Sequence, residues 1–218
     1  MIQTLKCCSF RIANLAKFEK QVLNWLKPFS IFCFLDNQQY TVSPHYTECL
    51  VAVDVRDFAE GKDIKRADDF LKKQQWTFGH LSYELKNRLH HLSSTKEDKI
   101  GFPLFYFFSP QIVLEIKDAL LVVHAEEPEK VFKAIQKQST EISKTYPLSI
   151  QPQPVLSKEE YTKKIKVLQE HIHRGDCYEI NFCQEFFAKD VAISPFAVFR
   201  KLMAISPNPF SALYRLND

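Results

Sequence analysis

The 218-residue sequence predicts an α+β protein, in which mainly antiparallel strands pack in two layers as a β-sandwich and helices lie on the outside. Two observations predict this class. Short apolar or alternating runs of strand length recur along the first two thirds of the chain. Segments with apolar residues at three- and four-residue steps, typical of amphipathic helices, separate or follow them. A hydrophobic content of 45% is enough to fill a core.

The N-terminal region is predicted to begin with an amphipathic helix at 18–26, which ends before Pro28. The continuous apolar run 31–35 is typical of a buried strand. It ends at Asp36 and Asn37, whose side chains favour turns because they bond their own backbone. The other elements expected here are strands at 49–55 and 102–110, a hairpin of 112–116 and 119–124 around Lys117 and Asp118, and helices at 67–75 and 129–142.

The strongest helix signal lies between Ser157 and Arg174. Ser157 is a good N-cap, and Glu160 three residues later completes a capping box. Gly175 follows the last turn, where glycine adopts the left-handed conformation at least cost. The alternating run 178–183 then predicts a strand. A helix at 195–205 and a strand at 210–216 complete the expected elements, and Asn217 begins a hairpin turn.

A proline-rich segment at 147–156 predicts a linker, because proline removes backbone donors and holds the chain extended. We therefore expect an N-terminal domain at 1–146 and the start of a second domain at 157–218. The strand at 210–216 has no evident partner in this second part. Two strands and two helices could not bury a core alone. We therefore expect 157–218 to be an incomplete domain.

The charge distribution argues against a nucleic-acid-binding protein. Net charge is +3, from 29 basic and 26 acidic residues that do not gather in a stripe. No apolar run approaches the roughly 20 residues of a membrane helix, and no secretory signal is evident, which predicts a cytoplasmic protein. Only four glycines occur, and no phosphate-binding glycine motif is present, which argues against a nucleotide enzyme of those types.

The cysteines and histidines predict no metal site. The six cysteines lack C-x-x-C spacing, so reduced thiols are expected rather than a disulfide framework. His80 stands beside a glycine with no partner pair for catalysis, and structural packing is expected for it. His90 and His91 are expected at a helix end, where histidine suits the helix dipole.

The segment from Gly175 to Gln184 resembles the opening of the chorismate-binding domain in the chorismate-utilising enzymes. The usual family form is G-D-x-Y-Q-V/I-N-L/F-x-Q, and Glu179 stands where the family usually carries glutamine. The matching positions, whose roles we leave unassigned, are Gly175, Asp176, Tyr178, Asn181 and Gln184.

Two other segments carry the same resemblance. Pro209-Phe210-Ser211-Ala212 is similar to component I of aminodeoxychorismate synthase, whereas anthranilate synthases commonly read N-P-S-P-Y-M there. Phe34 to Asn37 resembles the family element L-L/D-E/D-S, which helps to bind tryptophan in feedback-inhibited anthranilate synthases. Asn37 replaces its usual serine. The resemblance implies an effector pocket formed by Asp36, Asn37, Pro209, Phe210 and Ser211.

The resemblance implies an enzyme that replaces the C4 hydroxyl of chorismate with ammonia for para-aminobenzoate and folate synthesis. The implied partner is a glutamine amidotransferase subunit, and the implied cofactor is Mg²⁺. The family's catalytic lysine motif, P-I/M-K-G-T, does not occur in this sequence, nor do the glutamates that hold Mg²⁺. We therefore expect the N-terminal half of such an enzyme, with no catalytic or metal-binding residue among these 218.

Three alternatives stay open at this point. The first is component I of anthranilate synthase, in tryptophan synthesis. The second is a non-catalytic module that binds an effector or docks a subunit. The third is an α+β domain with another role. The downstream lysine motif would separate the first alternative from aminodeoxychorismate synthase, because the anthranilate branch usually lacks that lysine.

Overall fold

The computed structural model describes residues 5–40, 47–73, 75–94, 98–141 and 150–217. The chain divides into two compact units. The first contains Met1–Ser143 together with Val198–Asp218, and the second contains Lys144–Ala197. Among the described residues, no helix has the length and apolar character needed to cross a membrane.

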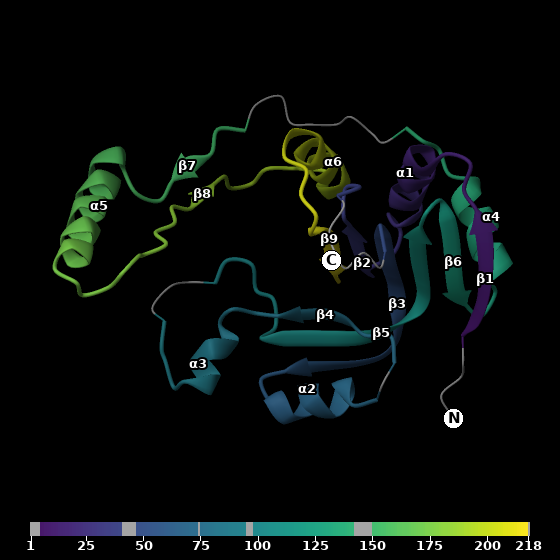
Figure 1. Cartoon of the computed structure of the whole chain (residues 1–218), viewed down its shortest axis with the longest axis horizontal. Helices are drawn as coiled ribbons and strands as arrows, with labels where there is room; N and C mark the ends of the chain where they lie inside the picture. Colours follow the sequence, from purple (N-terminus) through teal and green to yellow (C-terminus); the bar gives the residue numbers. More distant parts are fainter. Residues whose placement is uncertain (1–4, 41–46, 74, 95–97, 142–149, 218) are drawn as a thin grey trace. The chain divides into compact units, whose positions relative to one another are not determined.

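The first unit is built on a seven-stranded antiparallel sheet (Figure 1). Six strands follow the order β1-β6-β5-β3-β2-β9, and β4 pairs with β5 beside this path. Their bounds are β1 (Lys6–Arg11), β2 (Ile31–Asp36), β3 (Cys49–Gly61), β4 (Phe78–Leu81), β5 (Phe105–Lys117), β6 (Leu120–Ala125) and β9 (Ser211–Leu216). The predicted α+β class with mainly antiparallel strands is therefore confirmed. The described strands of this unit form one sheet rather than the two sheets of a simple sandwich.

The sheet nevertheless supplies both sides of an apolar core. Strands β3 and β5 are 13 residues long, and their register shifts between Val55 and Asp57. A bulge of this kind bends a strand and increases its twist. Three side chains from β4 and the beginning of β5 consequently pack against three from the other part of the sheet. The six buried residues are Phe78, Tyr106, Phe108, Cys33, Ala52 and Val113.

Helices cover the opposite face of the sheet. They are α1 (Leu15–Trp25), α4 (Pro128–Gln136) and α6 (Pro195–Ile205). Phe132 of α4 stacks on Phe10 of β1 with ring centroids 4.1 Å apart, and it also meets Phe18 of α1. Phe199 of α6 packs edge-on against Phe34 of β2. Aromatic contacts of this type add to the free energy gained from burial alone.

Two buried amides on α1 satisfy backbone groups after α4. The side chain of Gln21 donates to the carbonyl of Gln136 at 2.7 Å, and that of Asn24 donates to the carbonyl of Ser139 at 2.6 Å. The last carbonyls of a helix have no partner within it, so such bonds avoid burying unsatisfied acceptors.

The smaller helices α2 (Ile64–Leu71) and α3 (Leu85–Leu89) lie near the other end of β5. The predicted helix at 67–75 was placed too late, because Asp63 accepts from the backbone N–H of Lys65 at 3.0 Å and caps α2 three residues earlier.

The predicted hairpin, formed by β5 and β6, is confirmed. Its central residues are Asp118 and Ala119, with φ 50° and 59°, rather than Lys117 and Asp118.

The second unit contains α5 (Lys158–His173) and a short ribbon of β7 (Gln153–Pro154) with β8 (Phe186–Phe187). The predicted capping box of Ser157 and Glu160 is confirmed. Gly175 has φ 83°, and its N–H bonds the carbonyl of Ile172, which completes the predicted glycine stop. No residue of α5 is buried.

In the C-terminal region, the strand predicted at 178–183 was wrong, and the strand predicted at 210–216 is present but was wrongly expected to lack a partner. Residues 178–183 alternate in sequence but lie in no described ladder, since a strand needs a neighbour to bond its backbone. The strand at 210–216 was expected to lack a partner, yet β9 pairs with β2. Residues 198–218 thus group with the first unit.

The predicted linker at 147–156 lies partly outside the described residues, and its described part contains β7. The division into family domains at 1–146 and 157–218 stays a prediction.

Candidate functional site

The β2–β9 pair brings together two segments that are far apart in the sequence. Asp36, the last residue of β2, stands directly opposite Ser211, the first residue of β9. Opposed residues of an antiparallel pair have Cβ atoms roughly 5 Å apart. We define the corner as the ends of these two strands with the turns that adjoin them, residues 36–40 and 207–211 (Figure 1).

Asp36 is half-buried and held by the turn that follows it. One carboxylate oxygen accepts from the backbone N–H of Gln38 at 2.8 Å, and the other contacts the side-chain amide of Gln38. Burial raises the pKa of Asp36, and both bonds from Gln38 oppose that shift because they favour the ionised form. Asp36 is thus a partly desolvated carboxyl group at the edge of the corner.

The turn from Asn37 to Tyr40 is tight and strained. The backbone N–H of Tyr40 donates to the carbonyl of Asn37 at 3.0 Å, while Gln38 and Gln39 have φ of 52° and 59°. Left-handed conformations cost roughly 1–2 kcal/mol per residue with a Cβ atom. The side-chain oxygen of Asn37 accepts from the N–H of Gln39 at 2.8 Å, which offsets part of this strain.

The 207–211 segment is fixed by its own bonds. The side-chain oxygen of Asn208 accepts from the N–H of Phe210, and the Ser211 hydroxyl donates to the carbonyl of Asn208, both at 2.9 Å. Ser211 is buried, whereas the Phe210 side chain is 85% exposed. The Tyr40 hydroxyl donates to the carbonyl of Pro207 at 3.3 Å and joins the two turns.

The structure thus gathers all five residues predicted for an effector pocket at the corner, in two bonded turns. Their part in binding stays a prediction.

Two acidic residues near Asp36, Glu19 and Glu48, were not foreseen from the sequence. Burial, and then the charges of Asp36 and Glu48, raise the pKa of Glu19 on α1 to about 7. Cys49, opposite Asp36 in β3, has its thiol pKa raised by burial and by the same acidic neighbours. No local sequence signal relates these groups, because Glu19 on α1, Asp36 on β2 and Cys49 on β3 come near one another only in the folded protein.

The family-motif positions after α5 make mainly local contacts. The Asp176 carboxylate meets His171 at 2.6 Å and Arg174 at 2.9 Å, beside the helix stop at Gly175. The Gln184 side chain donates to the carbonyl of Leu156 at 3.1 Å. Tyr178 is 94% exposed, and Asn181 is exposed as well. No ligand role follows from these contacts, and the positions stay unassigned.

His80 and Tyr214 form a contact that the sequence did not reveal. One ring nitrogen of His80 lies 3.1 Å from the carbonyl of Pro103, and the other lies 3.3 Å from the Tyr214 hydroxyl. A carbonyl only accepts, so the proton is on Nε2 and the tyrosine donates to Nδ1. Burial raises the pKa of Tyr214. Both ring nitrogens of His80 are thus satisfied, in keeping with the packing role predicted for it.

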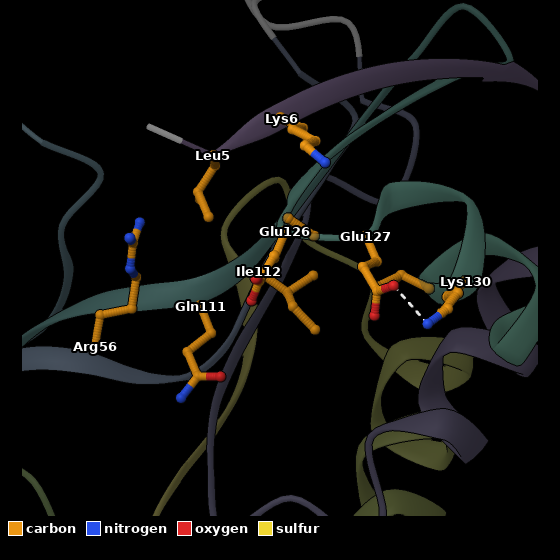
Figure 2. A pocket seen from close by; sticks show the side chains of 10 residues that line it. Leu5, Lys6, Arg56, Gln111, Ile112, Glu126, Glu127 and Lys130 are labelled. Atoms are coloured by element: carbon orange, nitrogen blue, oxygen red, sulfur yellow. Dashed lines mark ion pairs between the residues drawn. The ribbon is translucent and has the colours of Figure 1, made fainter. Parts of the chain in front are cut away.

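A pocket of about 600 Å³ lies between the start of β1, the middle of β3 and β5, the end of β6 and the start of α4 (Figure 2). Charged side chains of both signs line it, and Glu127 pairs there with Lys130 at 2.5 Å. The charged residues are Lys6, Arg56, Glu126, Glu127 and Lys130. None of the predicted site residues lines this pocket, so it is separate from the corner.

The described side chains do not fit the Mg²⁺ site that the resemblance implies. Within the ranges that the structure describes, no group of three or more His, Cys, Asp or Glu could hold a metal ion. The acidic residues near Asp36 therefore do not form a metal site.

Comparison with known proteins identifies similar sequences. The family model described as "chorismate binding enzyme" matches residues 32–218. Aminodeoxychorismate synthase component 1 of Klebsiella aerogenes is 28% identical over 150 residues, which are 64% of this chain and 32% of that protein. The Escherichia coli protein of the same name is 26% identical over 155 residues, 66% of this chain and 32% of that protein.

An anthranilate synthase component I-like protein of Synechocystis is 25% identical over 146 residues, 63% of this chain and 30% of that protein. The chain thus spans about a third of the length of the curated relatives it matches.

Proposed function

The chain belongs to the family of chorismate binding enzymes, and from this premise we propose that it is part of component I of an aminodeoxychorismate synthase. The proposed reaction joins chorismate and ammonia to give 4-amino-4-deoxychorismate for para-aminobenzoate and folate synthesis. A C–N bond forms at C4 and the hydroxyl group leaves as water. The proposed source of ammonia is a glutamine amidotransferase subunit, and the proposed location is the cytoplasm.

The observation that carries this proposal is the pairing of Asp36 with Ser211. These residues lie in the two outermost segments that resemble the family, and the fold joins those segments in one corner. The branch rests on Pro209-Phe210-Ser211-Ala212 and on relatives named aminodeoxychorismate synthase component 1. The described residues supply neither the family lysine motif nor a metal site, so no chemical step is assigned to a residue here.

We propose in addition that the corner binds an effector with a free amino group. The half-buried Asp36 carboxylate can accept from an ammonium group, and burial strengthens that attraction by lowering the local dielectric. The exposed ring of Phe210 offers an apolar surface next to it.

A calorimetric titration with tryptophan tests the effector proposal. We expect the unaltered protein to release binding heat and Asp36→Asn to bind tryptophan at least tenfold more weakly. Asp190→Asn, in the second unit, is the control and should bind as the unaltered protein does. No heat from the unaltered protein, or equal affinity in Asp36→Asn, would exclude this role for the corner.

A second candidate is component I of anthranilate synthase. The similarity to the anthranilate synthase component I-like protein of Synechocystis and to anthranilate synthase component 1 of Thermus thermophilus favours it. Its product from chorismate would be anthranilate.

Product analysis separates the two candidates. The native gene product, isolated from its source cells with any bound partner, is supplied with chorismate, ammonium and Mg²⁺. Aminodeoxychorismate is the expected product. Formation of anthranilate would favour the second candidate, and chorismate left unconverted would contradict both.

A further inference from the structure

Three side chains on neighbouring strands form a group far from the corner in sheet order. Cys7 of β1 stands directly opposite His124 of β6, so their side chains lie on the same face of the sheet. His124 in turn contacts Glu115 of β5, with Nε2 and Oε1 2.5 Å apart. A thiol, an imidazole and a carboxylate therefore follow one another across β1, β6 and β5.

The carboxylate fixes which ring nitrogen is basic. An ionised Glu115 only accepts hydrogen bonds, so Nε2 of His124 carries the proton and Nδ1 holds the lone pair. The indole of Trp76 lies 5.8 Å from the His124 ring and packs beside it.

The two adjacent cysteines differ in their surroundings. Successive residues of a strand point to opposite faces, so Cys8 faces away from His124. Cys8 donates to Glu129 at 3.2 Å, and this bond, with the nearby negative charge, raises the pKa of its thiol. Cys7 is exposed, and β1 is the outermost of the described strands on its side of the sheet, so small solutes can reach the sulfur.

We propose that Cys7 is a modification site for small hydroperoxides, with His124 as general base and Glu115 as the residue that positions it. The sulfur attacks one peroxide oxygen, the S–O bond forms and the O–O bond breaks. The thiol proton passes to His124 and then to the leaving hydroxide, which becomes water. Sulfur loses two electrons, peroxide gains them, and Cys7 becomes a sulfenic acid.

Cys8 does not capture this product as a disulfide. Adjacent residues in a strand have Cα atoms about 3.8 Å apart, below the separation of disulfide-linked residues. The sulfenic acid of Cys7 therefore remains available to an external thiol or trapping reagent.

The test treats the protein with hydrogen peroxide in the presence of dimedone, which traps sulfenic acids, and measures the labelled peptides by mass spectrometry. Trypsin cleaves after Lys6 and Arg11, so Cys7 and Cys8 fall in the same peptide. The starting protein is therefore Cys8→Ser, in which any label on this peptide is on Cys7. The exposed Cys183 is the internal reference. We expect Cys7 to be labelled about tenfold faster than Cys183, a modest share of what general bases typically contribute in enzymes.

His124→Gln and Glu115→Gln are expected to abolish most of this advantage, and circular dichroism confirms that each variant remains folded. If exposure alone set the reactivity of a thiol, Cys7 and Cys183 would be labelled at equal rates in the Cys8→Ser protein with His124 and Glu115 intact. This comparison does not depend on the folding of a His124 variant. Equal rates, or a Cys7 rate unchanged in folded His124→Gln, would overturn the proposal. Neither result bears on chorismate chemistry.

Discussion

Asp36 and Ser211 are opposed residues at the ends of β2 and β9, and the Ser211 hydroxyl donates to the carbonyl of Asn208 in the adjoining turn. This pairing places β9 in the same sheet as β1 and β2, although the strands are far apart in the sequence. The turn at 207–210 is consequently held against the turn at 37–40, where Tyr40 donates to Pro207.

Ser211→Ala should loosen this corner. The substitution removes a hydrogen bond from a buried residue and leaves the Asn208 carbonyl without this donor, which costs about 1–2 kcal/mol of unfolding free energy. Denaturant unfolding measures the change. Ser206→Ala, at an exposed position nearby, should change stability by less than about 0.5 kcal/mol. Equal effects of the two substitutions would contradict the role given to the Ser211 bond.

Gly79→Ala should be strongly destabilising. Gly79 has φ +147° and pairs with Phe107 of β5. An added Cβ would lie 1.9 Å from the carbonyl oxygen of the preceding residue, Tyr106. Backbone must move to relieve that contact, at a cost of about 3 kcal/mol or more. Gly61 provides the matched control, since its φ is +134° but nothing lies within 4 Å of an added Cβ. Gly61→Ala should carry the backbone strain alone, about 1–2 kcal/mol. Similar melting temperatures for the two variants would show that the close approach of β4 to β5 is wrong.

Local signals predicted the helix ends well and the strand partners poorly. The caps of α5 at Ser157 and Gly175 depend on residues a few positions apart, so the sequence suffices to place them. The pairing of β9 with β2 depends on residues distant in the chain, and no period or turn signal specifies it. The alternation at 178–183 shows the same limit, because it indicates a strand but supplies no partner.

The candidate site was predictable in its members but not in its chemistry. The resemblance named Asp36, Asn37 and Ser211, which the fold brings together. Glu19 belongs to a helix whose apolar pattern gives no reason to single it out, and only the fold, which brings it near Asp36 and Glu48, relates these carboxyl groups.

Glu19 should make stability depend on pH. Its folded-state pKa is about 7, above the ordinary value of 4.5, because burial and the charges of Asp36 and Glu48 disfavour ionisation. The unfolded chain therefore loses this proton first as pH rises, and stability falls between about pH 4.5 and 7 and stays lower above. Glu19→Gln should equal the unaltered protein at pH 4 and exceed its melting temperature at pH 8.

Glu170→Gln, at an exposed position of α5, is the control for this pH series. A stability difference between Glu19→Gln and the unaltered protein that is the same at pH 4 and pH 8 would contradict the buried-carboxyl account.

Ser157→Ala should weaken α5 from its N-terminus. The substitution removes the bond from the Glu160 N–H to the Ser157 hydroxyl, worth about 1 kcal/mol, so amide exchange in the first turns should quicken roughly fivefold. Hydrogen exchange with mass spectrometry resolves this helix from the sheet. Lys163→Ala, an exposed position of the same helix, should leave exchange nearly unchanged. Unaltered exchange in Ser157→Ala would mean that the capping box does not hold this end in solution.

The central claim is the assignment to aminodeoxychorismate synthase, and deletion of the gene in its source organism tests it most directly. Growth of the deletion strain is measured on minimal medium with para-aminobenzoate or tryptophan as the single supplement. Growth restored by para-aminobenzoate alone is the predicted result. Growth restored by tryptophan alone, or a strain that needs neither supplement, would contradict the assignment.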